Sequence, residues 1–326
     1  MMHKILISHP LYKPGMDELK RFAEIIITND GDSDHIIDLL KDVEGFILRI
    51  GKIDRKAIEE CPKLRVITRP GVGVDNVDVA AATENGIPVV ICPAGNSRAV
   101  AEHTIALIFS VAKNIVESDK ETRKGNFDIR NKYVAIELLD KIIAVVGFGH
   151  IGKIVASLCH GLGMKVIVYD PFFKKSDIEA YGYSYALEVE EALSLADFVT
   201  LHLPSFPETK NLFNDDRFSV MKRTSFLINC ARGDIVDEKA LFRALSEKKI
   251  AGAAVDVLVT EPMKADNPLM ALSNFIVTPH MAAQTQETTS QIVKLAVEGT
   301  IAVLNGNKWP NVCNPEVYTH PRWREC

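Results

Sequence analysis

The sequence lacks several features that would place it in a specialised class of proteins. Its 326 residues contain no uninterrupted apolar run of about 20 residues, so no transmembrane helix is expected. Acidic residues outnumber basic ones by 43 to 38, for a formal net charge of -5. A mildly acidic chain has no global electrostatic reason to bind nucleic acid or an anionic membrane surface. We therefore expect neither as a partner.

Metal-binding and disulfide patterns are also missing. None of the six cysteines forms a CxxC pair, and none has the spacing of a zinc site. They are Cys61, Cys92, Cys159, Cys230, Cys313 and Cys326. Most lie in apolar stretches, which favours reduced thiols in a reducing compartment. The apolar run near the N-terminus is too short for a signal peptide. We expect a cytoplasmic protein without a bound metal ion.

The chain is too long for one ordinary core, and its length predicts two domains of about 150 residues each. Short β-branched runs alternate with helical patterns, which indicates βαβ units and parallel sheets. One series of strands is predicted at residues 4–8, 24–28, 45–48, 64–68 and 88–91. A second is predicted at 141–146, 164–169, 198–203, 225–229, 252–257 and 275–278. The fold class is therefore α/β, with two doubly wound parallel sheets.

Two long helical patterns, residues 99–116 and 282–304, indicate how the domains divide the chain. In the simplest arrangement the second helix crosses back to the first sheet. The first domain is then discontinuous, with residues 1–98 and 284–326, and the second comprises residues 99–283.

A glycine-rich loop directly follows the predicted strand at 141–146. The loop reads Gly147-Phe148-Gly149-His150-Ile151-Gly152, a GxGxxG pattern. A helical pattern and a further strand follow, which together are typical of a Rossmann dinucleotide site. Gly147 allows the tight turn, Gly149 lets the backbone approach a pyrophosphate, and Gly152 lets the helix pack closely on the strand. The N–H groups at the start of the helix favour the phosphates.

The strand after this helix ends at Asp170, 18 residues beyond Gly152. A carboxylate there accepts hydrogen bonds from the 2′-hydroxyl of an adenine ribose and repels a 2′-phosphate. No arginine follows immediately, since the next residues are Pro171 and two phenylalanines. The sequence therefore favours NAD over NADP.

Four further motifs resemble one family, the D-isomer-specific 2-hydroxyacid dehydrogenases. They are residues 69–76 (RPGVGVDN), 229–237 (NCARGDIVD), 255–257 (VDV) with 261–262 (EP), and 278–280 (TPH). They stand in the family's order and spacing and, with the glycine loop, cover most of the chain. The resemblance implies a discontinuous flavodoxin-like substrate domain and a Rossmann NAD-binding domain. Within the family, the sequence is most similar to the phosphoglycerate dehydrogenases.

The resemblance implies hydride transfer between NAD and C2 of a small 2-hydroxy or 2-keto acid. It makes Arg232, Glu261 and His280 the catalytic residues. Their side chains suit the chemistry, because a guanidinium pairs with a substrate carboxylate. An imidazole with an ordinary pKa near ~6.5 exchanges a proton with the substrate oxygen. A neighbouring carboxylate stabilises the imidazolium and orients the ring.

The resemblance also assigns binding positions. The cofactor-binding positions are Gly147, Gly149, His150, Ile151, Gly152, Asp170, His202, Pro204, Thr209, Cys230, Ala231, Asp256 and Ala282. The substrate-binding positions are Arg49, Val72, Gly73, Asn96, Arg232 and His280. The N–H groups of the loop containing Val72 and Gly73 suit a carboxylate, and Asp256 is expected at the nicotinamide carboxamide. A purely structural role for His202 and Pro204 stays open.

The identity of the substrate depends on one arginine. Arg49 follows a predicted strand and resembles the position that phosphoglycerate dehydrogenases use for the substrate phosphate. Arg130 and Lys132 are weaker candidates for this role, and solvated surface charge is the alternative for all three. The prediction is 3-phosphoglycerate and 3-phosphohydroxypyruvate as substrates. A glyoxylate or hydroxypyruvate reductase is the alternative within the family.

Two expectations concern partners and regulation. A homodimer through the helix after residue 98 and its surroundings is implied by the resemblance. The family's long regulatory C-terminal extension is absent from the sequence, so feedback through such a domain is not expected. A different class of function, an NAD-sensing interaction protein resembling a corepressor, also stays open, because such relatives keep the catalytic residues.

Overall fold

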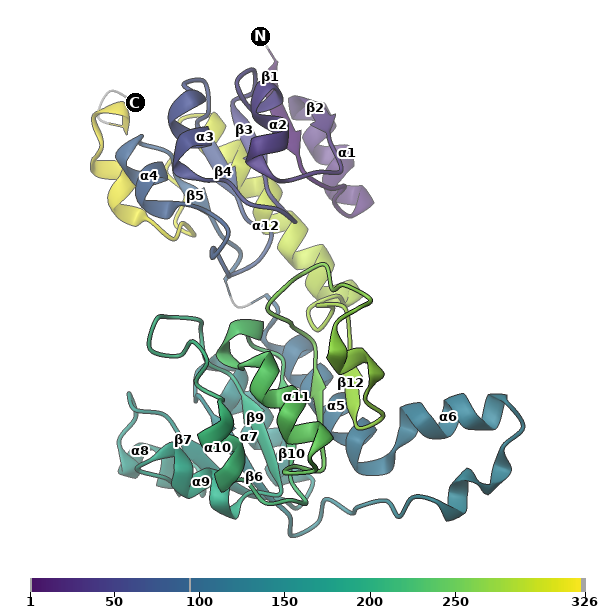
Figure 1. Cartoon of the computed structure of the whole chain (residues 1–326). Coiled ribbons are helices and arrows are strands. Elements are labelled where there is room, and N and C mark those ends of the chain that lie inside the picture. The colour runs from purple at the N-terminus through teal and green to yellow at the C-terminus, as the bar shows by residue number, and fades with distance from the viewer. Residues whose placement is uncertain (1, 94, 324–326) are drawn as a thin grey trace. The chain divides into compact units, whose positions relative to one another are not determined.

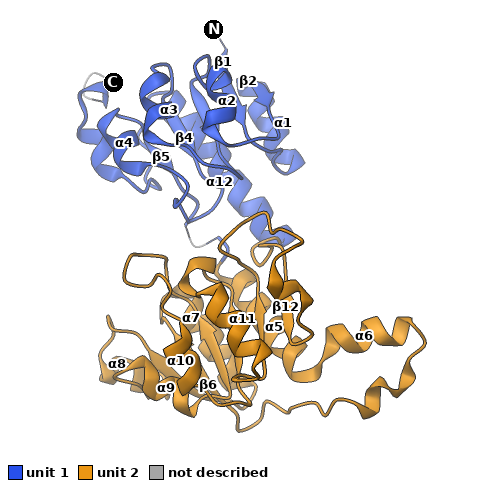
Figure 2. Ribbon diagram, viewed as in Figure 1, with its two compact units in different colours: residues 1–96, 285–326 blue, residues 97–284 orange. Residues whose placement is uncertain are grey.

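A computed structural model describes residues 2–93 and 95–323 of the chain. They form two compact units (Figures 1 and 2). Unit 1 comprises residues 1–96 and 285–326, and unit 2 comprises residues 97–284. The limits lie beside the predicted boundaries at 98/99 and 283/284.

Unit 1 is built on a parallel sheet that has five strands among the described residues. These are β1 (His3–Ile7), β2 (Ala23–Ile27), β3 (Gly45–Ile47), β4 (Val66–Thr68) and β5 (Val89–Val90). Its helices are α1 (Lys13–Phe22), α2 (Ser33–Leu40), α3 (Arg55–Glu60), α4 (Val79–Glu84) and α12 (Gln286–Leu304), with 3-10 turns at Pro315–Thr319 and Pro321–Trp323. The strand order β2-β1-β3-β4-β5 is that of flavodoxin-like folds.

Alternation along these strands produces a core on each face of the unit 1 sheet. Leu6 and Phe46 face α2, α3 and α4, whereas Ile5 and Ile47 face α1 and α12. The helices on the first face begin at acidic caps. The Asp54 carboxylate, for example, accepts the Ala57 N–H at 2.9 Å at the start of α3.

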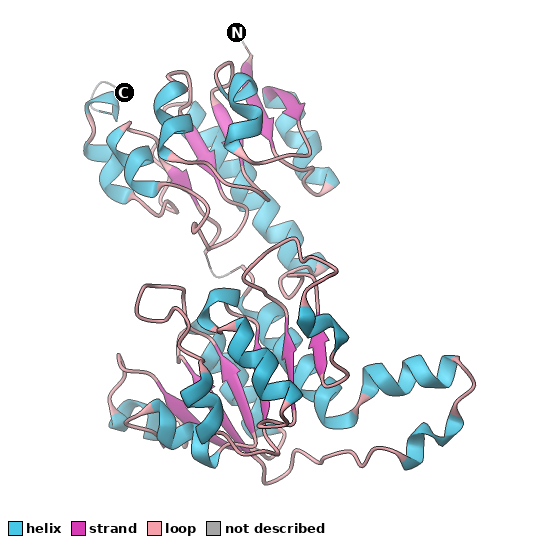
Figure 3. Cartoon of the chain, viewed as in Figure 1, coloured by secondary structure: helices cyan, strands magenta, loops and turns pink. Residues whose placement is uncertain are grey.

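Unit 2 is built on a parallel sheet with seven strands among the described residues (Figure 3). These are β6 (Ile142–Val146), β7 (Lys165–Tyr169), β8 (Ser184–Tyr185), β9 (Phe198–Leu201), β10 (Phe226–Asn229), β11 (Gly252–Val255) and β12 (Phe275–Val277). Its α-helices are α5 (Ser97–Lys113), α6 (Ile115–Arg123), α7 (His150–Gly161), α8 (Lys175–Glu179), α9 (Val189–Leu195), α10 (Asp215–Val220) and α11 (Glu238–Ser246). Three 3-10 turns are η1 (Phe127–Asn131), η2 (Gly233–Ile235) and η3 (Pro268–Ala271).

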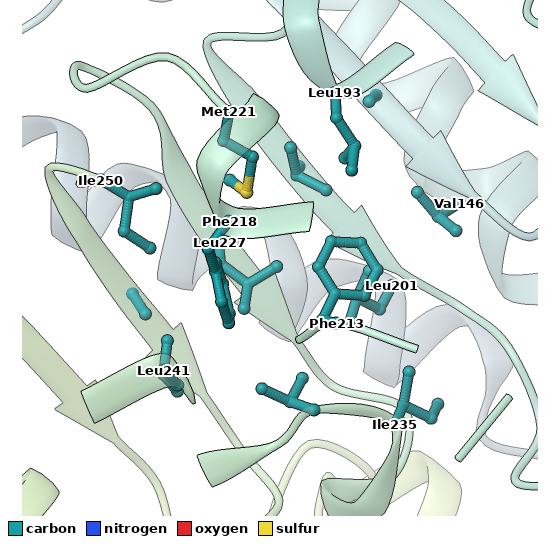
Figure 4. Packing of buried hydrophobic residues seen from close by; sticks show 14 of the residues in the cluster. Val146, Leu193, Leu201, Phe213, Phe218, Met221, Leu227, Ile235, Leu241 and Ile250 are labelled. Atoms are coloured by element: carbon teal, nitrogen blue, oxygen red, sulfur yellow. The ribbon is translucent and has the colours of Figure 1, made fainter. Parts of the chain in front are cut away.

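The strand order of unit 2 is β12-β11-β10-β9-β6-β7-β8. With β6 taken as strand 1 and the sheet read from β8, this is the 3-2-1-4-5-6 order of a Rossmann sheet, and β12 is one further strand at its edge. Helices α5 and α7 pack on one face, and α9, α10 and α11 pack on the other. Figure 4 shows the second core, in which Phe213, Leu227 and Leu241 lie together. The predicted α/β class with two doubly wound sheets is confirmed.

Some elements differ from the predictions. The two-residue strand β8 was not predicted, because two residues are too short to show alternation. The helix predicted at 99–116 ends at Lys113, since Asn114 has a left-handed backbone with φ 51. The helix predicted at 282–304 begins at Gln286, where the Thr285 side chain caps it. This helix, α12, packs against α1 and β4 of unit 1.

Helix α6 and turn η1 form an arm that projects from α5 within unit 2 (Figure 1). Among residues 2–93 and 95–323, no single helix has the length and apolar composition to cross a membrane. Helices α5 and α6 meet both criteria only when they are joined, and the chain bends by 62° between them.

Candidate active site

Most of the predicted site residues follow strands of the unit 2 sheet. Its strands are parallel, so their carboxyl ends lie at one edge, where doubly wound sheets bind ligands. The predicted cofactor positions follow β6 (Gly147, Gly149, His150, Ile151, Gly152), β7 (Asp170), β9 (His202, Pro204, Thr209), β10 (Cys230, Ala231), β11 (Asp256) and β12 (Ala282). The predicted catalytic residues follow β10 (Arg232), β11 (Glu261) and β12 (His280).

The glycine loop is shaped as its pattern predicts. Gly147 has φ 97, and a Cβ there would lie 2.6 Å from His202 O. A Cβ on Gly152 would lie 2.1 Å from Gly147 O, so the start of α7 packs directly on the loop. A Cβ on Gly149 would meet no described atom within 4 Å. The loop is therefore closed toward the sheet and open at Gly149, before the first turn of α7, which fits a pyrophosphate.

Asp170 lies next to the glycine loop and is buried. Its Oδ2 accepts a hydrogen bond from Phe148 N at 2.7 Å, and its Oδ1 accepts one from Phe172 N at 2.9 Å. Each carboxylate oxygen can accept a second hydrogen bond. The side chain is thus fixed in orientation and retains acceptors for the hydroxyl groups of a ribose.

The segment after β9 is held by its own side chains. His202 Nε2 bonds Thr200 Oγ1 at 2.9 Å, and burial lowers the pKa of His202 to about 3. Its Nδ1 is buried without a hydrogen-bond partner among the described residues. Thr209 Oγ1 donates to Pro204 O at 2.7 Å and closes the loop. The neutral His202 ring and the closed loop together fix the conformation of the segment after β9 at the sheet edge.

The loop after β10 presents Arg232. Asn229 is 1% exposed, and its side chain accepts from Ala231 N at 2.9 Å and donates to Arg232 O at 2.8 Å. Arg232 Nη1 donates to Ala231 O at 2.7 Å. Burial raises the pKa of the Cys230 thiol to about 12, so this side chain stays neutral. Asn229 opens the 229–237 motif, but no role was predicted for it.

Glu261 and His280 meet although they follow different strands. His280 Nδ1 lies 2.7 Å from Glu261 Oε2, and Leu258 N donates to Glu261 Oε1 at 3.0 Å. A carboxylate only accepts hydrogen bonds, so Nδ1 of the imidazole carries the proton in this contact. Nε2 is therefore the ring nitrogen left to exchange a proton with a ligand.

Electrostatics tune this pair. The hydrogen bond to Glu261 raises the pKa of His280 against the effect of burial, with a further contribution from Asp256 and an opposing one from Arg232. Burial raises the pKa of Glu261, but its hydrogen bond with His280 and the positive charges of His280 and Arg232 leave that pKa below its usual value. The structure thus brings all three predicted catalytic residues into one interacting cluster.

Asp256 holds the chain that follows β12. It is 1% exposed, and it accepts hydrogen bonds from Met281 N at 2.9 Å and Ala282 N at 2.8 Å. Thr278 and His103 also contact this carboxylate. Thr278 belongs to the 278–280 motif but had no expected role of its own, and His103 carried no sequence signal, because its side chain meets Asp256 only once α5 has packed on the sheet.

The remaining predicted substrate positions lie in unit 1, also after strands. Arg49 follows β3, is exposed, and its guanidinium donates to Pro10 O. Val72 and Gly73 follow β4. Arg69 joins these two loops, because its Nη1 donates to Arg49 O at 2.8 Å and its Nε donates to Gly73 O at 3.1 Å. The loop at Val72 and the loop at Arg49 are therefore held together at one sheet edge.

The other three residues predicted as candidates for substrate binding lie outside these two loops. Asn96 is the last residue of the first segment of unit 1. Arg130 lies in η1 on the arm of unit 2 and stacks over Phe127, and Lys132 follows η1 and lies over Tyr133.

Comparison with known proteins decides the family. Residues 105–282 match the family model described as "D-isomer specific 2-hydroxyacid dehydrogenase, NAD binding domain". This chain belongs to the D-isomer-specific 2-hydroxyacid dehydrogenase family. The match confirms the predicted family and identifies NAD as the cofactor of the domain.

Relatives within the family carry two different names. D-3-phosphoglycerate dehydrogenase of Methanocaldococcus jannaschii is 39% identical over 314 residues, which cover 96% of this chain and 60% of that protein. The chain thus spans about 60% of the length of this relative. Glyoxylate reductase of Korarchaeum cryptofilum is 32% identical over 324 residues, with 97% of each chain covered.

A solved structure resembles most of the chain. NAD-dependent formate dehydrogenase from Staphylococcus aureus, in complex with NAD, superposes with a TM-score of 0.84 at 30% identity. The likeness covers 94% of this chain and 97% of that one.

Proposed function

We propose that this protein is an NAD-dependent D-2-hydroxyacid dehydrogenase that interconverts a small 2-hydroxy acid and its 2-keto acid. NAD, when bound, exchanges a hydride with C2 of the substrate. The proposal rests on the cluster of Arg232, Glu261 and His280, which lies at the same sheet edge as the open glycine loop.

The three side chains have distinct proposed roles. His280 donates a proton from Nε2 to the substrate oxygen during reduction and takes it back during oxidation. Glu261 fixes the tautomer and stabilises the imidazolium through the 2.7 Å contact. Arg232 offers a planar fork of donors to the substrate carboxylate.

The NAD site is proposed at the carboxyl edge of the unit 2 sheet. The open backbone at Gly149 and the first turn of α7, with His150 and Ile151, suit the pyrophosphate. Asp170 suits the ribose hydroxyls and disfavours a 2′-phosphate. The loops after β9, β10 and β12 are proposed to enclose the rest of the cofactor.

A panel of 2-keto acids tests this function. We expect NADH oxidation with at least one of 3-phosphohydroxypyruvate, hydroxypyruvate, glyoxylate and pyruvate, and slower oxidation of NADPH. Tight NADH binding without turnover of any of these acids would contradict the proposal. It would instead favour an NAD-sensing interaction protein.

Within this activity we propose 3-phosphoglycerate and 3-phosphohydroxypyruvate as the substrates. The similarity to phosphoglycerate dehydrogenases supports this choice. So does the position of Arg49, whose loop Arg69 ties to the loop of Val72 and Gly73. These two loops suit a phosphate and a carboxylate, respectively.

The Arg49→Ala variant tests the phosphate site. Loss of a charge-assisted hydrogen bond of about 1.5–3 kcal/mol lowers kcat/KM for 3-phosphohydroxypyruvate by about 10–100-fold. The same variant leaves hydroxypyruvate and glyoxylate unaffected, and Arg21→Ala on α1 is the matched control. Equal turnover of phosphorylated and unphosphorylated acids would favour the alternative, a glyoxylate or hydroxypyruvate reductase. Parallel variants of Arg130 and Lys132 test the weaker candidates.

We further propose a homodimer formed through α5 and the arm. Exposed apolar side chains on the arm and in the segment that follows it support this, since Val116 is 50%, Phe127 69% and Val134 92% exposed. Light scattering of the wild type and of Phe127→Asp is the test, and a monomeric wild type would contradict it. A cytoplasmic location is proposed from the cysteines, which are free in the described part of the chain.

A further inference from the structure

The buried carboxylate of Asp256 receives its hydrogen bonds from the chain that carries His280. Besides the N–H groups of residues 281 and 282, it accepts a hydrogen bond from Thr278 Oγ1, at 2.5 Å to Oδ1. A carboxylate that is 1% exposed requires such donors, because burial without them is unfavourable. These donors flank His280 on both sides in the sequence. Asp256 therefore clamps the loop of residues 278–282.

A histidine on helix α5 completes this network. His103 Nε2 lies 3.0 Å from Thr278 Oγ1 and 3.5 Å from Asp256 Oδ1. The Thr278 hydroxyl has one hydrogen, and it donates that hydrogen to Asp256. His103 must therefore be the donor to Thr278, and the direction runs from His103 through Thr278 to Asp256. Since α5 packs against β10 and β11, the donor sits on a rigid element.

The backbone of His280 needs such support. Its φ is 50, in the left-handed region that non-glycine residues rarely occupy. Its N–H donates to Asp256 O at 2.9 Å and to Thr278 O at 3.0 Å. The two residues of the network therefore also fix the turn that directs the imidazole toward Glu261.

We propose that His103 is a positioning residue for His280, acting through Thr278 and Asp256. Its Nε2–H donates to the Thr278 hydroxyl and so orients that hydroxyl toward Asp256. This keeps the hydrogen bonds between Asp256 and residues 278–282 in place. This inference rests on the proposed function only in that His280 is taken as the proton donor. The clamp itself is a property of the loop and can be measured without any substrate.

Two pairs of variants separate hydrogen bonding from packing. Thr278→Val keeps the branched shape and removes the hydroxyl, whereas Thr278→Ser keeps the hydroxyl. His103→Phe keeps a ring and removes the donor, whereas His103→Gln keeps an N–H donor. The first member of each pair breaks the network, and the second is its matched control.

The first readout is the pKa of His280, followed by NMR titration of its imidazole, with the signal assigned through His280→Asn. The groups that act on this ring are Glu261 and Asp256, which raise its pKa, and Arg232, which lowers it. A loosened loop separates His280 from Glu261. We therefore expect Thr278→Val and His103→Phe to lower the pKa of His280 toward its usual value, and Thr278→Ser and His103→Gln to preserve it.

The second readout is kinetic. We expect Thr278→Val and His103→Phe to lower kcat by about tenfold or more, since the chemical step depends on the position of His280. The controls should retain most of kcat. An unchanged pKa of His280 in His103→Phe would overturn the proposal, as would a His103→Gln variant as impaired as His103→Phe.

The outcomes also distinguish this proposal from the proposed function. A wild type without reductase activity would contradict the function, while the NMR titration would still decide the role of His103. An active wild type whose kcat and His280 pKa are unaffected by both His103 variants would refute the positioning role alone. If Thr278→Val fails to fold, the His103 pair carries the test.

Discussion

Replacing Glu261 with glutamine tests the proposed proton donor most directly. Both oxygens of Glu261 accept hydrogen bonds, Oε2 from His280 Nδ1 at 2.7 Å and Oε1 from Leu258 N at 3.0 Å. A glutamine has one oxygen and one NH₂ group, so it must turn a donor toward one of these two donors. The variant therefore loses the negative charge and also mismatches one hydrogen bond.

The size of the effect follows from the exposure of the pair. A hydrogen bond to a charged group contributes about 1.5–3 kcal/mol, and a neutral one about 0.5–1.5 kcal/mol. The side chains of His280 and Glu261 are 55% and 37% exposed, so screening by solvent reduces the difference. We take the low end, about 1 kcal/mol, which is about fivefold in the protonation equilibrium of His280.

The sign of the pH effect is defined. Glu261 raises the pKa of His280, so the imidazolium persists to higher pH in the wild type. Removing the charge lowers that pKa. The alkaline limb of the reductive rate and the acidic limb of the oxidative rate then both move to lower pH. At pH values above the pKa of His280, we expect kcat/KM for reduction in Glu261→Gln to be about fivefold or more below that of the wild type.

The assay is kcat/KM for the preferred 2-keto acid, measured with NADH from about pH 5 to about pH 9. Glu238→Gln is the matched control. Glu238 Oε1 accepts a hydrogen bond at 2.7 Å from Val259 N, in the loop that carries Glu261, and Glu238 has no proposed contact with His280. An alkaline limb at the same pH in Glu261→Gln and the wild type would refute the assignment of Glu261 and His280 as the working pair.

Three further predictions address the two binding functions and the donor itself. His280→Ala is expected to lower kcat by about 10²–10⁴-fold with little change in NADH affinity; surviving activity would show that the proton donor is misassigned. Gly149→Ala should unfold at the same temperature as the wild type, because its Cβ meets no described atom within 4 Å. It should nevertheless bind NADH about tenfold more weakly, a change of about 1.4 kcal/mol in binding free energy that calorimetry measures. Asp170→Ala is expected to weaken NADH binding and narrow the preference over NADPH, and an unchanged ratio of kcat/KM for the two cofactors would contradict the ribose assignment.

Features that depend on only a few neighbouring residues could be predicted from the sequence. The alternation of strands with helices and the glycine loop that ends at Gly152 are local patterns, and both led to the confirmed fold class. The candidate site residues could be predicted for a related reason. Most lie in the loop after a strand, as His280 lies after β12, and parallel topology brings the ends of such strands to one edge without further information.

Tertiary structure decided what depends on partners far apart in the chain. The contact between His103 and Thr278 spans 175 residues, and no local pattern specifies it, because it exists only once α5 has packed on the sheet. The tie from Arg69 to the Arg49 loop has the same origin. Local sequence therefore determined which chemical groups this protein carries and at which sheet edge they emerge. Only packing determined the hydrogen bonds that orient them, since these join side chains whose separation is set by the whole domain.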